Sequence, residues 1–159
     1  MMNTQLCFEE TLLEAAKEVL EMSAFMEVEV YTEGNAAIEG DSILGTLTFK
    51  GAMEGCLAIR CSVNCARNMA IAMLGMDPTE SLSQSEIADS LGEVTNMVLG
   101  SFKARIQATI GNIEVSIPSV VMGQRLEGSL GEGASRAVIN VVTAENNLIE
   151  IGLLYRAKH

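Results

Sequence analysis

The segment from about residue 85 to residue 109 constrains the fold most, because its apolar residues recur at helical spacing on one side only. At about 100° per residue, a single face collects the apolar side chains. These are Ile87, Leu91, Val94, Val98 and Phe102. The opposite face carries Glu86, Asp89, Glu93, Asn96 and Gly100. We therefore predict a long helix, capped by Ser83 or Ser85, that buries one side and exposes the other.

The rest of the chain mixes helical spacing with strands that alternate apolar and polar residues. Helices are expected at residues 4–24, 63–74 and 85–109, and strands at residues 26–33, 40–51, 54–62, 112–126 and 135–157. Ser62 is the expected cap of the second helix, Gly75 is its stop, and Pro118 breaks the fourth strand segment. The turns "GAMEG" and "AENN" indicate two antiparallel hairpins. This predicts an α+β fold with a mixed, mostly antiparallel sheet and long helices, in a single domain over residues 1–159.

Charge and hydropathy exclude several classes of function. The net charge of −11 disfavours a nucleic-acid backbone or an anionic membrane as the main partner, because both would be repelled. No run of about 18 apolar residues is present, and the acidic N-terminal segment lacks the features of a secretory signal. The glycine-rich residues 127–135 lack a Walker lysine and are expected to form a loop rather than a phosphate site. We expect a cytoplasmic protein.

The cysteines do not form a pattern typical of a metal site. They are Cys7, Cys56, Cys61 and Cys65, without a C-x2-C pair, and the single histidine is the terminal His159. Small apolar residues surround Cys61 and Cys65. We therefore expect buried, reduced thiols and no metal or other cofactor held by this chain.

Two residues of the polar helix face suggest a chemical role. Glu93 and Asn96 are three residues apart, so their head groups can converge on one external point, and Gly100 leaves that face clear about one turn later. An asparagine amide can donate to and accept from a water and so orient it, and a glutamate can pair with a partner's lysine. The pair suits a surface that enters another protein's active site. On the helical pattern alone, an ordinary solvated face remains the alternative.

The same residues resemble the motif of the CheC and CheX family of chemotaxis phosphatases. That motif has Asp or Ser, then Glu after three residues, Asn after two more, and a later Pro. Asp89, Glu93, Asn96 and Pro118 match it, with 21 residues between the last two, one fewer than in the family pattern. The flanking text "EIADSLGEVTNMVLGSFKARI" and "VSIPSVVMG" is also similar. One motif copy, where CheC-type members carry two, indicates CheX.

The resemblance implies a phosphatase that hydrolyses the aspartyl phosphate of a CheY-type response regulator. Asn96 would place the attacking water and Glu93 would pair with the regulator's lysine. Asp89, Glu86, Gly100 and Pro118 would support the site or contact the partner. The regulator would bring its own Mg²⁺, and the chain would form a homodimer. The alternative is a non-catalytic binding module for a response regulator or a flagellar switch component.

Overall fold

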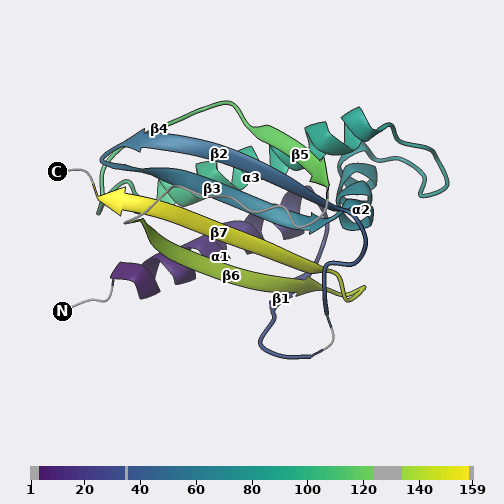
Figure 1. Ribbon diagram of the computed structural model, residues 1–159, viewed down its shortest axis with the longest axis horizontal. Coiled ribbons are helices and arrows are strands. Elements are labelled where there is room, and N and C mark those ends of the chain that lie inside the picture. The colour runs from purple at the N-terminus through teal and green to yellow at the C-terminus, as the bar shows by residue number, and fades with distance from the viewer. Residues whose placement is uncertain (1–3, 35, 124–133, 158–159) are drawn as a thin grey trace.

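The computed structural model describes residues 4–34, 36–123 and 134–157, and Figure 1 shows how their helices and strands are arranged. The helices are α1 (Thr4–Ser23), α2 (Val63–Leu74) and α3 (Gln84–Ile106). The strands are β1 (Val28–Val30), β2 (Ser42–Gly51), β3 (Met53–Ser62), β4 (Ile113–Val115), β5 (Ser119–Gly123), β6 (Ser135–Thr143) and β7 (Leu148–Ala157). Most of the glycine-rich residues 127–135, predicted to be a loop, lie outside the described residues.

The strands of the described residues form one seven-stranded sheet. Its order is β1-β6-β7-β3-β2-β4, and β5 also pairs with β2. All of the paired strands run antiparallel. Both predicted hairpins, β2–β3 and β6–β7, are present and lie side by side in the sheet (Figure 1). The predicted α+β class with a mostly antiparallel sheet is therefore confirmed.

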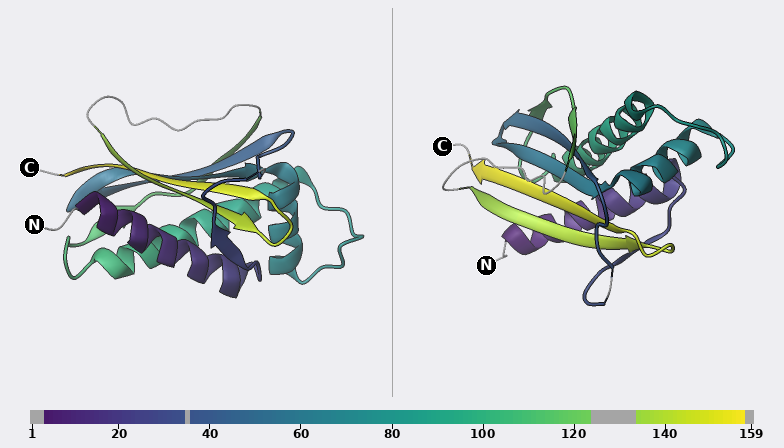
Figure 2. Two further views of the ribbon diagram at one scale, coloured as in Figure 1. Left: turned by 90° about the horizontal axis from the view of Figure 1, so that it is seen from below. Right: turned by 45° about the vertical axis from the view of Figure 1, so that its right-hand side comes forward.

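Helices α1 and α3 pack on one face of this sheet, and α2 stands near one end of it (Figure 2). Ring contacts join the layers: Phe8 of α1 lies 5.9 Å from Phe102 of α3 and 4.9 Å from Tyr155 of β7, measured between ring centroids. Aromatic pairs at such distances add to the free energy of burial. In the described parts of the chain, no helix is both long enough and apolar enough to cross a membrane.

Arg105 also links the two long helices at the surface. Its Nη1 lies 3.0 Å from Oε2 of Glu14, and its Nη2 lies 2.7 Å from Oε2 of Glu18. Each such pair contributes little by itself in water, but the guanidinium fork fixes two carboxylates of α1 at once. The C-terminal half of α3 is thereby held against α1.

Several element boundaries differ from the sequence prediction; β1, for example, covers only Val28–Val30 of the strand expected at residues 26–33. Helix α3 ends at Ile106 rather than at residue 109, because Ile106 is its last residue that reaches the core and the next three residues are exposed. In the strand segment before Pro118, only Ile113 is buried, while Val115 and Ile117 are 36% and 87% exposed. Pro118 has no N–H to donate to the sheet, so the strand stops before it. The apolar residues Val115 and Ile117 of the alternating pattern therefore lie outside the core.

Both predicted ends of α2 are confirmed. The hydroxyl oxygen of Ser62 accepts a hydrogen bond from the Cys65 N–H at 3.0 Å. At the other end, Gly75 has a left-handed φ of 64°, and the N–H of Met76 donates to the Ile71 carbonyl at 3.0 Å. This is a glycine-terminated cap, in which the left-handed residue lets the chain turn back onto the last helical carbonyls.

Candidate functional site

Helix α3 presents its polar residues to the outside, as the helical pattern predicts. We call Glu86, Asp89, Glu93, Asn96 and Gly100 the outward stripe. All five are exposed. The apolar residues expected on the opposite face are all buried, namely Ile87, Leu91, Val94, Val98 and Phe102. The placement of the stripe is therefore confirmed, while the chemical roles of its residues stay predictions.

A close contact with β2 fixes the height of α3 above the sheet. A Cβ atom at Gly45 would be closer to the Thr95 hydroxyl oxygen than Cβ atoms in real structures come to a neighbouring heavy atom. It would also lie 3.3 Å from Cγ of Leu91. Thr95 is fully buried, and its hydroxyl donates to the Leu91 carbonyl at 2.7 Å. Thr95 lies one position before Asn96. Sequence reasoning missed this contact: a glycine inside a strand signals that something approaches closely, but not which element.

Pro118 lies beside the helix rather than within the outward stripe. A Cβ at Gly92 would be 3.7 Å from Cβ of Pro118 and 3.5 Å from Cγ2 of Val120. These are ordinary van der Waals distances, so the link from β4 to β5 packs directly on the flank of α3. Gly92 is buried in this contact, which gives it a packing role and sets Pro118 next to the residue that precedes Glu93.

The first turn of α3 is closed by a reciprocal cap. The Ser83 hydroxyl oxygen accepts from the Glu86 N–H at 3.1 Å, and Oε1 of Glu86 accepts from the Ser83 N–H at 3.2 Å. Each side chain thus satisfies a backbone N–H that has no partner within the helix. Of the two serines predicted as caps, Ser83 is the one used. Glu86, predicted as a supporting or partner-binding residue, has a structural role in this cap.

We expect Ser83→Ala to lower the free energy of unfolding by about 0.5–2 kcal/mol, because the Glu86 N–H loses its acceptor. Urea denaturation followed by circular dichroism measures this loss. Ser81→Ala is the matched control, since Ser81 is exposed in the loop before the cap. Equal stability of the two variants would contradict the assigned cap.

A groove lies along the stripe where α3 faces the end of α2. It has a volume of about 310 Å³ and is lined by Met73, Leu74, Glu86, Asp89, Ser90 and Glu93. The α2 residues were not singled out from the sequence, because an apolar side chain in the last turn of a helix is usually part of a core. Here Leu74 is 52% exposed.

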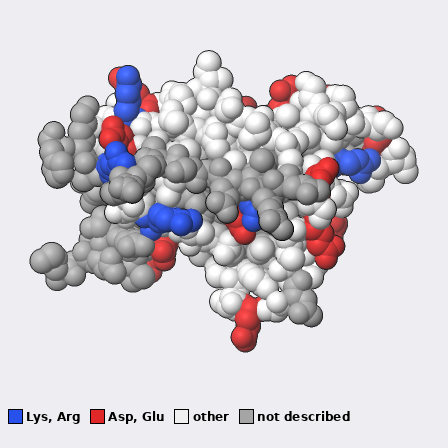
Figure 3. All heavy atoms as spheres, viewed as in Figure 1, with Lys and Arg blue, Asp and Glu red and all other residues white. Residues whose placement is uncertain are grey.

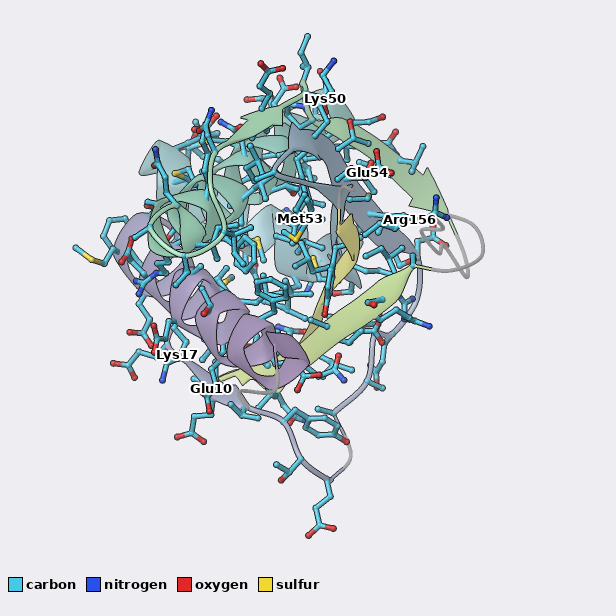
Figure 4. The ribbon with its side chains drawn as sticks, turned by 90° about the vertical axis from the view of Figure 1, so that its left-hand side faces the viewer. Glu10, Lys17, Lys50, Met53, Glu54 and Arg156 are labelled. Atoms are coloured by element: carbon cyan, nitrogen blue, oxygen red, sulfur yellow. The ribbon has the colours of Figure 1, made fainter. Side chains whose placement is uncertain are left out.

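A larger hollow, of about 520 Å³, lies at the far end of the sheet and contains none of the stripe residues. Lys50, Glu54 and Arg156 are among its lining residues and lie near one another in Figure 4. Figure 3 shows charges of both signs interspersed on this sheet side of the molecule. Its size does not make it the better candidate, because it contains neither Glu93 nor Asn96, the predicted catalytic residues.

The described cysteines are free and buried, as predicted, whereas the side chain of Cys7 lies outside the described residues. A hydrogen bond between Cys61 and Cys65 raises the pKa of the first thiol and lowers that of the second. Among the described residues, no group of three or more His, Cys, Asp or Glu side chains could hold a metal ion. Both thiols have a relative exposure of 0%, which fits a packing role.

The exposed geometry limits what Glu93 and Asn96 can do. Neither is a nucleophile activated by a neighbouring base, and both are exposed on the surface of α3. An asparagine amide there can still hold a water by one donated and one accepted hydrogen bond, and a carboxylate can receive a lysine. The pair therefore fits chemistry on a group that another protein presents.

Comparisons with known proteins bear on the family and the fold of this chain. A family model described as "Chemotaxis phosphatase CheX" matches residues 43–141. No curated protein matches the chain. Among solved structures, the chemotaxis protein CheX from Vibrio vulnificus is 25% identical, covers 98% of this chain and 100% of its own, and has a TM-score of 0.77.

Two further structures share the fold at lower identity. One is a CheX–CheY–BeF3–Mg²⁺ complex from Borrelia burgdorferi, at 22% identity over 92% of this chain and 96% of that chain, with a TM-score of 0.75. The other is FliY from Thermotoga maritima, at 16% identity over 96% and 90% of the two chains, with a TM-score of 0.66.

Proposed function

Because the chain belongs to the chemotaxis phosphatase CheX family, we propose that it hydrolyses the aspartyl phosphate of a CheY-type response regulator. In this reaction a water oxygen attacks phosphorus and the bond between phosphorus and the aspartyl oxygen breaks. The products are the unphosphorylated aspartate side chain of the regulator and inorganic phosphate. The phosphoryl group and its Mg²⁺ belong to the regulator. The CheX–CheY complex from Borrelia burgdorferi supports a partner of this class.

The single observation that carries the proposal is the exposed pair of Glu93 and Asn96 on α3. This helix packs against β2 and against the link from β4 to β5. We assign to Asn96 the placement of the attacking water in line with the breaking bond. We assign to Glu93 a charge-assisted hydrogen bond with the regulator's lysine, which sets the docking register. Since phosphoryl transfer depends mainly on positioning and electrostatics, two such side chains suffice when the partner supplies the remaining groups.

Three further expectations are part of this proposal. The chain acts as a single domain over residues 1–159, forms a homodimer and works in the cytoplasm. Asp89 lies beside Glu93 in the groove and would contact the partner from the edge of the site. Sedimentation velocity of the purified chain tests the dimer, and a monomer at micromolar concentration would contradict it.

The test of the proposed function is phosphate release from a panel of phosphorylated receiver domains in buffer with Mg²⁺, with and without the protein. We expect loss of phosphate from at least one receiver to accelerate when the protein is added. Binding without acceleration would favour the non-catalytic binding module. If receivers from the same organism show no binding and no acceleration, both the phosphatase and the binding module are contradicted.

Substitutions at Gly100 test separately whether the partner comes close to the outward stripe at this position. A Cβ there would meet nothing within 4 Å, so Gly100→Ala should stabilise the protein by about 0.5–1 kcal/mol. Gly100→Phe should instead weaken turnover of the phosphorylated receiver, because a ring would stand where the partner approaches. Ala104→Phe is the control, since Ala104 is exposed one turn farther from Asn96. Full activity of Gly100→Phe in the phosphate-release assay would show that no partner passes close to this position.

A further inference from the structure

The groove between the end of α2 and α3 has a rigid wall with an exposed apolar edge. Leu74, the last residue of α2, is 52% exposed although the left-handed Gly75 and the hydrogen bond from Met76 to Ile71 hold the helix end in place. The following loop is also anchored, because Nη2 of Arg67 donates to the carbonyls of Pro78 and Glu80 at 3.2 and 3.0 Å. The exposure of Leu74 therefore belongs to an ordered surface.

The charged residues that line the groove are all acidic. From residue 73 to residue 93 the chain carries five carboxylates and no lysine or arginine. Three of them, Glu86, Asp89 and Glu93, line the groove itself. Arg67 is the basic side chain that reaches this loop, and its guanidinium donates to backbone carbonyls rather than to the carboxylates. The groove thus combines an apolar wall with an acidic wall, which complements an apolar side chain flanked by basic ones.

The groove is continuous with the proposed catalytic pair, because Glu93 belongs to both. A protein partner that reaches Glu93 from the groove side comes close to Leu74, which lines the same groove. A stable protein complex buries about 800 Å² on each partner, which a few residues of one helix face cannot supply. Contacts beyond the outward stripe are therefore needed, and the apolar edge of α2 is the neighbouring surface that can provide them.

We propose that this groove is a second docking contact for the phosphorylated receiver, occupied by a helix or loop of the receiver that presents an apolar side chain next to lysine or arginine. The inference rests on the proposed phosphatase function and adds to it the part of the surface that selects the partner. Glu93 and Asn96 perform the chemistry, whereas Leu74 contributes binding that is equal in the ground state and the transition state. Loss of such uniform binding raises KM and leaves kcat unchanged.

The test compares Leu74→Gln with wild type in phosphate release from the best phosphorylated receiver. We expect KM to rise about tenfold, equivalent to about 1.4 kcal/mol, with kcat unchanged. Met22→Gln is the matched control, because Met22 is an apolar helix residue of α1 that is 75% exposed. It should keep the KM of wild type. All three proteins keep the carboxylates of the groove, which attract the receiver. Raising the salt concentration screens this attraction and should therefore increase KM for all three.

Several outcomes separate this inference from the proposed function. If wild type accelerates phosphate loss but Leu74→Gln keeps its KM, the docking groove is wrong and the phosphatase stands. If no receiver loses phosphate faster, the proposed function itself fails. If Leu74→Gln changes the sedimentation coefficient without changing KM, the groove serves contact between copies of this chain, and the inference is overturned.

Discussion

Asn96→Ala should lose about 10²- to 10³-fold in kcat for the phosphorylated receiver, the usual cost of removing one positioned hydrogen-bonding group from a transition state. The alanine can neither donate to the attacking water nor accept from it, so the water loses its orientation. Asn96 is exposed, and alanine favours a helix more than asparagine does, so the fold should remain at least as stable. Single-turnover phosphate release with saturating protein measures the loss apart from binding.

Two variants sharpen this experiment. Asn96→Asp has the same shape but presents only acceptors and a negative charge to a phosphoryl group, so it should be as inactive as the alanine variant. Asn64→Ala removes an exposed asparagine from α2 and should behave as wild type. Near-normal kcat in Asn96→Ala, at matched receiver occupancy, would remove Asn96 from the mechanism and favour a role of the surface in binding alone.

Gly45→Ala should damage both the fold and the site, although Gly45 lies on β2 and not on α3. The added Cβ would press against the Thr95 hydroxyl oxygen and Leu91, and overpacking of this kind costs about 1–3 kcal/mol. A shift of α3 away from the sheet would relieve the clash. A displacement of about 1 Å of a positioned group can reduce turnover by about 10²-fold. Thermal unfolding and kcat measure the two effects.

A double-mutant cycle assigns this effect to the named contact. Thr95→Ala removes the hydroxyl that a Cβ at Gly45 would meet, so the variant with both changes should recover a large part of the stability lost in Gly45→Ala. Recovery of kcat in the same variant would show that turnover depends on the position of α3 relative to the sheet. Simple additivity of the two single changes would contradict the contact, because uncoupled sites show no interaction energy.

The outward stripe shows how far the sequence alone can go. The 3.6-residue period of α3 is a local property, and it predicted correctly which side is buried, from Ile87 to Phe102, and which side carries Glu93 and Asn96. The Ser62 and Gly75 ends of α2 and the β2–β3 and β6–β7 hairpins were predictable for the same reason. Each depends on residues close together in the chain, and caps and turns have strong residue preferences.

Only the tertiary structure decided how these elements approach one another. It set Thr95 over Gly45, about 50 residues away in sequence, and placed Pro118 against Gly92. It also left Leu74 exposed beside Asp89, on a helix that the sequence had not connected with the site. Periodicity gives the direction of a side chain relative to its own helix or strand. The identity of the element it faces depends on how distant segments pack together, and no local pattern encodes that.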